Sequence, residues 1–469
     1  MNEQSADWAI LVYISADRVL ANFAVESLKQ LKRSAGEGII ALVQAQGSQE
    51  AEARRYLFDG KGDRNASIEK NRVLSIDPPL SPGGIADPAN LTKFIAWASG
   101  YKAKHHCLFL WGHGYELLLN DDQEIKARKS GRNYLAPKSL KQALENAKVS
   151  VPGVKLDIIG VDACSLSLVE LASELTDCGD FMIASQEDVP DMSFPYEQLL
   201  LRLRTERPGS VEEICKAVPR LYRQAYQDYV VAPDTGMKEF TLASLRLKNV
   251  DRITEPLTRL ASALLPLTFD SSVRKAVLAA RKLARDFALG LFVDLYDFCI
   301  QLGEKISDVE LKSACDAVRK AIDSHEKEAC IIENQAGKDE ETRCHGLSIY
   351  FPYLAKTDLK QAAQAFVAGG TDLVDQLPLL IKGGTNHILK ARGGKISEIE
   401  SDFESLTKFK QTRWSEFIKH GWSVILAAEE ARELDEHYSA QQCAINLLSL
   451  CRPSPSAAAS REAATAARA

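Results

Sequence analysis

Short, unbroken runs of apolar residues alternate with helical patterns through roughly the first 200 residues of the chain. Strands are predicted at residues 8–14, 39–44, 54–58, 106–111, 156–161 and 181–184. Helices are predicted between them at residues 22–32, 88–99, 139–147 and 166–175, with Asp87 as the N-cap of the second. Strands that are buried on both faces of a sheet have such continuous apolar runs. The pattern therefore predicts an α/β fold with a mostly parallel sheet flanked by helices.

Helical patterns dominate from about residue 211 onward, with shorter strand-like runs at 240–242 and 347–351. Residues 356–450 have an almost entirely helical pattern, which adds a largely helical C-terminal region to the fold. The last residues are rich in Ala, Ser and Arg and have no apolar stripe, so they are expected to be disordered. The predicted parts are a first domain at 1–245, a mixed helical and strand subdomain at 246–365, a helical region at 366–451 and a tail at 452–469.

Composition narrows the range of partners. The 469 residues include 58 basic and 64 acidic side chains, a net charge of −6, which offers no positive field for a nucleic-acid backbone. No apolar run approaches the roughly 18 to 20 residues of a membrane span. The run at 8–14 is interrupted by Asp17 and Arg18 and is typical of a buried strand rather than a signal peptide. We therefore expect a cytoplasmic monomer that binds neither nucleic acid nor membrane, with its ten cysteines reduced.

Two of the predicted parallel strands end in chemically reactive side chains. His113 follows one strand and lies between two glycines, and Cys164 follows another strand 51 residues later. Ligands of parallel sheets bind at the carboxyl ends of the strands, so the imidazole and the thiol could serve one substrate. The predicted helix after Cys164 would favour its thiolate through the helix dipole. Taken singly, a buried structural cysteine and an ordinary loop histidine are the alternatives.

Several separated segments resemble the clostripain-like cysteine peptidases, relatives of caspases and gingipains. In chain order they are WAILVYISADRVL, DPANLTKFIAWA, LFLWGHG, LDIIGVDACSLSLVELASEL, ASQEDVPDMSFPY, VDLYDF and HGLSIYFP, with QTRWSEF as an extension. The resemblance covers residues 7–355 and implies a caspase-like sheet in the first domain. The chain departs from the family at Tyr115 and Glu116, where glycine and tryptophan are frequent, and at Arg18, where asparagine is common.

The resemblance implies a role for each matching residue. Cys164 would be the nucleophile, and His113 would protonate the leaving amine and then activate water. The backbone N–H groups of Gly114 and Cys164 would form the oxyanion hole. Asp162 would lie in the S1 pocket and accept a P1 Arg or Lys, although it could instead cap the strand end. A second S1 acid would come from Glu187, Asp188 or Asp191, among which the sequence does not choose.

The segment 120–133 between His113 and Cys164 is polar and carries four basic residues, Lys126, Arg128, Lys129 and Arg132. It is either a solvated loop or a site where the protease itself, or an upstream protease, cuts to activate a zymogen. No cofactor is expected. The resemblance includes calcium-stimulated members, but without an EF-hand motif a calcium site stays unassigned, and no other metal site is expected.

The sequence therefore predicts an Arg/Lys-specific cysteine endopeptidase acting on proteins or peptides, with a stress or antiviral cascade as a conceivable setting. A catalytically silent caspase-like scaffold that binds proteins is the alternative, and a thiol hydrolase of small amides is a third possibility. The C-terminal helices either pack against the peptidase or dock a regulator, in which case Trp414, Phe417 and Trp422 would be the anchors.

Overall fold

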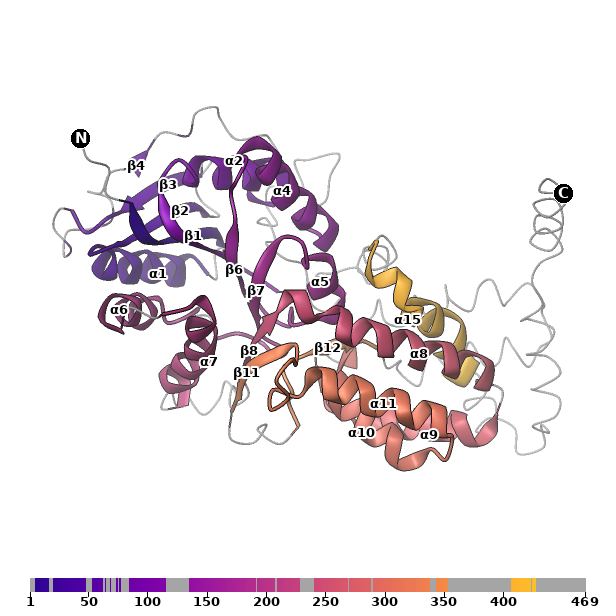
Figure 1. Cartoon of the computed structure of the whole chain (residues 1–469). Helices are drawn as coiled ribbons and strands as arrows, with labels where there is room; N and C mark the ends of the chain where they lie inside the picture. Colours follow the sequence, from indigo (N-terminus) through magenta and orange to yellow (C-terminus); the bar gives the residue numbers. More distant parts are fainter. Residues whose placement is uncertain are drawn as a thin grey trace, which may run out of the picture.

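The computed structural model describes residues 5–16, 20–47, 53–61, 64, 68, 73–74, 76, 84–114, 135–190, 192–206, 209–227, 240–268, 270–287, 290–337, 343–352, 406–422 and 424–426. A large central sheet organises them (Figure 1), in the strand order β11-β8-β7-β6-β5-β1-β2-β3-β4. Its middle is parallel and consists of β1 (Ala6–Ala16), β2 (Ile39–Gly47), β5 (Ala103–Trp111), β6 (Leu156–Asp162) and β7 (Gly179–Ala184).

Antiparallel strands complete both edges of this sheet. On one side lie β3 (Arg54–Phe58) and β4 (Val73–Leu74), and on the other β8 (Thr241–Arg246) and β11 (Ile331–Ala336). β11 lies beyond the predicted division at residue 245, yet it hydrogen-bonds to β8 on the near side. The predicted domain bounds stay predictions. The central sheet extends across the predicted division at residue 245.

Helices bury both faces of the sheet, as the continuous apolar strands require. One face is covered by α2 (Pro88–Ala98), α4 (Pro137–Ser150) and α5 (Val169–Glu174), and the other by α1 (Ala21–Ser34), α6 (Tyr196–Glu206) and α7 (Val211–Gln227). Neighbouring residues in one strand point to opposite faces, so that Ile159 belongs to the first core and Ile158 to the second. Asp87 caps α2, accepting a hydrogen bond from the Ala89 N–H at 2.8 Å. The predicted fold class is confirmed.

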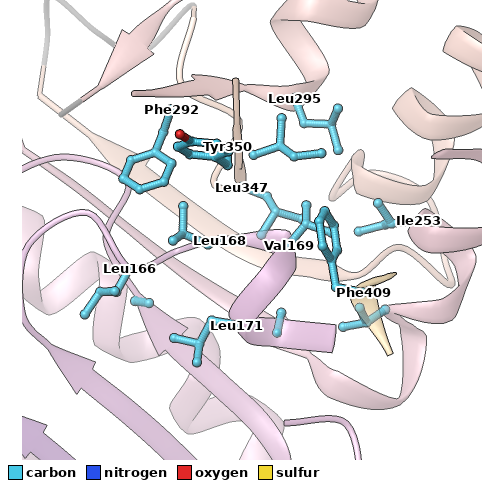
Figure 2. Packing of buried hydrophobic residues seen from close by; sticks show 14 of the residues in the cluster. Leu166, Leu168, Val169, Leu171, Ile253, Phe292, Leu295, Leu347, Tyr350 and Phe409 are labelled. Atoms are coloured by element: carbon cyan, nitrogen blue, oxygen red, sulfur yellow. The ribbon is translucent and has the colours of Figure 1, made fainter. Parts of the chain in front are cut away.

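A small second sheet packs beside the first. Its antiparallel strands are β9 (Asp286–Phe287), β10 (Phe292–Asp294) and β12 (Ser348–Tyr350), in the order β12-β10-β9. The helices α8 (Asp251–Leu267), α9 (Ser271–Leu283), α10 (Leu295–Lys305) and α11 (Val309–Ile322) lie next to it (Figure 1). α5 and the residue before it contact the second sheet: Leu168, Val169 and Leu171 meet Leu347 and Tyr350 in one apolar core (Figure 2).

A C-terminal segment, with the short helical turns Phe409–Thr412, Trp414–Glu416 and Phe417–Trp422, closes this core. The indole N–H of Trp414 donates to the Tyr350 carbonyl at 2.9 Å, and that of Trp422 donates to the Pro352 carbonyl at 2.8 Å. Phe417 is also fully buried. The three aromatic residues are therefore packed inward, and the alternative in which they anchor an external regulator is wrong. The remainder of 356–450 lies outside the described residues, as does the predicted disordered tail.

No helix among the described residues is both long and apolar enough to cross a membrane.

Candidate active site

The carboxyl ends of β5 and β6 bring His113 and Cys164 to one edge of the sheet. The two strands are parallel neighbours, with Trp111 paired to Asp162, and the Gly112 N–H donates to the Asp162 carbonyl at 3.3 Å. His113 and Cys164 each lie two residues beyond these paired positions. The strand ends that carry His113 and Cys164 are therefore neighbours at one edge of the sheet, while the catalytic roles of the two residues stay predictions.

Gly114 lies directly against the backbone of Cys164. A β-carbon at position 114 would be 2.0 Å from the Cys164 carbonyl oxygen and 2.3 Å from its nitrogen, so no side chain fits there. The Gly114 N–H also hydrogen-bonds the Cys164 sulfur. Glycine at this position therefore allows backbone donors to gather at the thiol, as an oxyanion hole requires.

The chain after Cys164 differs from the prediction. The helix expected at 166–175 is α5 and begins only at Val169, because Ser165 adopts a left-handed conformation with φ 55° and Leu168 pairs with Ser348. Cys164 is thus five residues before the helix and separated from its first turn. Stabilisation of the thiolate by the dipole of this helix was expected and is wrong, since that effect is confined to the first turn.

The environment of Cys164 favours the neutral thiol. The Val189 N–H approaches the sulfur at 3.3 Å, and the Val189 carbonyl lies 4.0 Å from it. Burial, together with the nearby Asp188 carboxylate, raises the pKa of Cys164 to about 12, and hydrogen bonds from the Val189 and Gly114 backbone oppose this only in part. With this pKa the cysteine is protonated at neutral pH and only partly accessible to solvent, whereas an activated nucleophile would be an accessible thiolate.

Asp162 is buried below the edge of the sheet, 3% exposed. Its Oδ2 atom accepts hydrogen bonds from the Ser193 hydroxyl, the Phe194 N–H at 3.0 Å and the Tyr196 hydroxyl at 3.0 Å. Burial raises the pKa of Asp162 to about 6, although these donors counteract the effect. Within the described part of the chain, its Oδ1 atom is buried without a hydrogen-bond partner. One carboxylate oxygen is thus fixed and the other is left to accept a donor.

The candidates for a second S1 acid have different surroundings. Glu187 binds Arg285, with 3.1 Å between Oε2 and Nη2, and its Oε1 accepts from the Asp188 N–H at 3.0 Å. Asp188 faces the sulfur of Cys164. Asp191 lies outside the described residues, as do Tyr115, Glu116 and the four basic residues Lys126, Arg128, Lys129 and Arg132.

Three groups that complete the surroundings of the site were not predicted from the sequence. Val189 covers the sulfur, Ser193 orients Asp162, and Arg285 holds Glu187. The first two belong to the quoted segment ASQEDVPDMSFPY, which could have indicated them, whereas Arg285 is 98 residues from Glu187 in the chain. No group of three or more His, Cys, Asp or Glu side chains in the described residues is placed to hold a metal ion. A calcium site stays a prediction.

Comparison with known proteins identifies the class and then the family. The sheet resembles that of solved C11 cysteine proteases, and the family model described as the clostripain family matches residues 12–422. The chain therefore belongs to the clostripain family of cysteine proteases, and the caspase-like fold expected from the sequence is confirmed. No curated protein matches the chain at a significant level.

Two solved structures illustrate the likeness. An inactive zymogen C11 protease from Parabacteroides distasonis is 17% identical, with a TM-score of 0.52, and the match covers 75% of this chain and 94% of that one. A secreted C11 cysteine protease from Bacteroides thetaiotaomicron, in complex with an irreversible peptide inhibitor, is 16% identical, with a TM-score of 0.52 and coverage of 74% and 92%. At this identity the likeness concerns the fold.

Proposed function

We propose that this protein is a cysteine endopeptidase with Cys164 as nucleophile and His113 as general acid and base. The observation that carries the proposal is the arrangement of three neighbours at one sheet edge: His113 after β5, Cys164 after β6, and Gly114 against the Cys164 backbone. This edge of a parallel sheet is where ligands bind, and the thiol and imidazole are the pair that acyl transfer needs.

The chemistry proceeds in two stages. The Cys164 sulfur, after losing its proton, forms a bond to the carbonyl carbon of the substrate, and the backbone N–H groups of Gly114 and Cys164 hold the oxyanion. His113 protonates the amine as the C–N bond breaks, which leaves a thioester on Cys164. Water, deprotonated by His113, then attacks the thioester and releases the acid and the free thiol.

Asp162 supports cleavage after Arg or Lys. Its Oδ1 atom is buried without a partner among the described residues, and Oδ2 is held by three donors, so the carboxylate is fixed toward a cation. We propose Asp162 as the main S1 acid. Asp188 or Asp191 would be the second acid, since Glu187 is already bound to Arg285.

The raised pKa of Cys164 supports a zymogen. We propose that cutting within 120–133, at Lys126, Arg128, Lys129 or Arg132, by this protein or by an upstream protease, converts the protonated thiol into an active one. Protein or peptide substrates, a monomeric state, a cytoplasmic location and a role in a stress or antiviral cascade belong to the same proposal. A location outside the cell is the alternative, because a relative of similar fold is secreted.

A second candidate function is supported by the same observation. A silent scaffold that binds proteins would also tolerate a protonated cysteine in contact with the Val189 backbone. The two functions differ in whether a cut chain hydrolyses peptides, so one assay separates them.

The test uses purified protein, before and after an engineered cut within 120–133, with fluorogenic peptides ending in Arg, Lys, Asp or Leu. We expect turnover after Arg and Lys by the cut protein and its loss by at least ~10⁴-fold in Cys164→Ala, as for other catalytic nucleophiles. A gel of the uncut chain follows self-cleavage. No turnover by the cut, folded protein would favour the scaffold, and turnover only after Asp or Leu would exclude the role of Asp162.

The S1 assignment has a matched control on the same strand. Asp162→Asn should lower kcat/KM for Arg peptides by ~10²-fold or more, because a buried charge pair with the substrate is lost. Asp157 lies at the opposite end of β6, where it accepts from the His106 N–H at 2.8 Å. Asp157→Asn should leave kcat/KM unchanged, and an equal loss in both variants would attribute the effect to folding.

A further inference from the structure

The loop that follows β7, residues 185–189, lies across the thiol. In addition to the two Val189 contacts with sulfur, the Glu187 carbonyl accepts from the Ser165 N–H at 3.1 Å and the Ser185 carbonyl accepts from the Ser167 N–H at 2.8 Å. The loop is thus hydrogen-bonded to Ser165 and Ser167, which follow Cys164 in the chain. Asp188 adds a carboxylate beside the sulfur. This loop sets both the exposure and the charge environment of Cys164.

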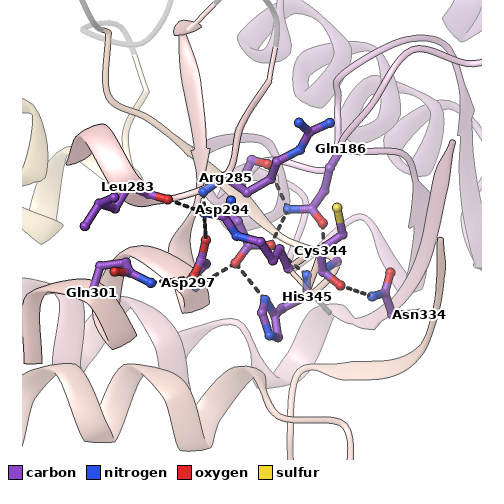
Figure 3. A network of polar contacts seen from close by, with 12 residues as sticks. Gln186, Leu283, Arg285, Asp294, Asp297, Gln301, Asn334, Cys344 and His345 are labelled. Atoms are coloured by element: carbon purple, nitrogen blue, oxygen red, sulfur yellow. Dashed lines mark hydrogen bonds and ion pairs between the residues drawn. The ribbon is translucent and has the colours of Figure 1, made fainter. Parts of the chain in front are cut away.

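The other side of the loop is held by the second sheet, through Gln186 (Figure 3). Its Nε2 atom donates to Asp294 Oδ2 at 3.0 Å and to Ser348 Oγ at 2.9 Å, and its Oε1 atom accepts from the Gly346 N–H at 2.7 Å. Gln186 is 1% exposed, so these contacts replace all the water that its amide would bind. The side chain bridges β10 and the start of β12.

Glu187 provides a second, ionic anchor. Its carboxylate binds the Arg285 guanidinium at 3.1 Å, with both side chains largely buried, 16% and 20% exposed. Arg285 precedes β9, and its N–H donates to Asp297 Oδ2 at 2.7 Å. Asp297 in turn binds Arg343, so the anchor belongs to a wider polar network (Figure 3).

We propose that residues 185–189 form an inhibitory strap over Cys164, and that the second sheet holds this strap closed through Gln186 and Glu187. The strap contacts the sulfur through Val189, which leaves Cys164 only partly accessible to solvent, and it keeps the Asp188 carboxylate next to the thiol; both effects disfavour a thiolate. Release of either anchor moves the strap away and makes the cysteine reactive. This inference rests on the proposed function, because it describes how the proposed active site would be regulated. The regulating contacts come from residues between 285 and 348.

The experiment measures the reactivity of Cys164 directly. Full-length protein is treated with iodoacetamide across pH 6 to 10, and alkylation of Cys164 is followed by peptide mass spectrometry, with Cys164→Ala as the blank. In Arg285→Gln the alkylation rate at pH 7.5 should rise ~10-fold, because well below its pKa a thiol whose pKa falls by about one unit has tenfold more thiolate. Arg343→Gln is the matched control, because Arg343 binds Asp297 in the same network without touching the strap. It should react like the wild type.

Folding is checked by circular dichroism and thermal melting. Glu187→Gln removes the same ion pair without a change of shape, and it carries the test if Arg285→Gln unfolds. Folded Arg285→Gln or Glu187→Gln protein with the wild-type alkylation rate across pH 6 to 10 would overturn the proposal, as would an equal rise in Arg343→Gln. Alkylation needs no turnover, so failure of the strap and failure of the peptidase assay are separate results.

Discussion

Two segments meet at Cys164, and they are anchored by different forces. The segment after β6 carries the nucleophile and continues into α5, which is held by apolar packing: Leu168, Val169 and Leu171 are at most 3% exposed in the core (Figure 2). The segment after β7 is the strap, which is held by the amide of Gln186 and the carboxylate of Glu187 (Figure 3).

This difference in anchoring predicts that the segment after β6 determines the stability of the protein, whereas the strap determines the reactivity of Cys164. Apolar burial contributes to folding in proportion to area and cannot be exchanged for water, so it fixes where the nucleophile lies. Polar and ionic anchors exchange protein partners for water at little net cost, so they can release a segment without unfolding the protein. Damage to α5 should therefore lower stability, whereas damage to the strap should change the thiol.

The largest effect is expected from Leu171→Ala. Leu171 is 1% exposed, and its truncation should lower the free energy of unfolding by ~2–5 kcal/mol, as measured by urea denaturation. The alkylation rate of Cys164 in the folded protein should not change. Val149→Ala on α4, at a side chain 80% exposed, is the control and should stay within ~0.5 kcal/mol of the wild type. Faster alkylation in Leu171→Ala would mean that apolar packing also holds the strap.

Glu170 makes α5 sensitive to pH. Burial raises the pKa of Glu170 to about 7, and hydrogen bonds from the Tyr350 N–H at 2.8 Å and from its own backbone N–H offset this only in part. The native protein then binds more protons than the unfolded chain, whose Glu pKa is about 4.3. This group therefore lowers stability progressively as pH rises from about 4.3 to 7, by at most ~4 kcal/mol.

Glu170→Gln tests this assignment. Its stability relative to the wild type should increase between pH 5 and pH 8, measured by urea denaturation at both values, because the amide stays neutral. An identical difference at pH 5 and pH 8 would contradict the raised pKa of Glu170.

Glu174, one turn further along α5, should give the opposite sign. Burial would raise its pKa, but hydrogen bonds from the Lys141 ammonium at 3.0 Å, from the Lys408 N–H and from Thr407 lower it. The ionised carboxylate therefore contributes stability above the unfolded pKa, and this is lost as pH falls through the folded pKa. Glu174→Gln should cost ~3 kcal/mol at pH 8, since it removes the carboxylate that neutralises Lys141, whose side chain is 15% exposed, and less at pH 4. Equal costs at both values would exclude the ion pair as the source.

The parts of the fold that depend on a strong local sequence pattern could be predicted from the sequence. The apolar runs of the parallel strands and the Asp87 cap locate the central sheet and α2, and through the sheet edge they place His113 near Cys164. The same kind of local pattern led to a helix predicted from residue 166, which is three residues too early. Leu166 and Leu168 have helical spacing relative to the apolar residues of α5, but they are not part of this helix. Leu168 instead pairs with Ser348, because a strand 180 residues later is available.

The strap could not be predicted for a related reason. β9 and β10 have two and three residues, too few for a period-2 pattern to stand out. The Glu187–Arg285 pair and the contacts of Gln186 join residues 98 to 162 positions apart. Charge and amide side chains occur throughout the chain, so their partners depend on the tertiary fold.

A change in salt concentration should have the smallest effect of these experiments on the molecule. It should also distinguish the ionic anchoring of the strap most clearly from the apolar anchoring of the segment after β6. The side chains of the Glu187–Arg285 pair are largely buried, so screening is weak, and raising NaCl from 0.05 to 0.5 M should increase wild-type alkylation of Cys164 by no more than about twofold. Iodoacetamide is uncharged, and its encounter with the thiol does not depend on salt. Arg285→Gln should show no such increase, because it has no ion pair to screen. An equal increase in both proteins would place the salt effect elsewhere and leave Gln186 as the anchor that holds the strap.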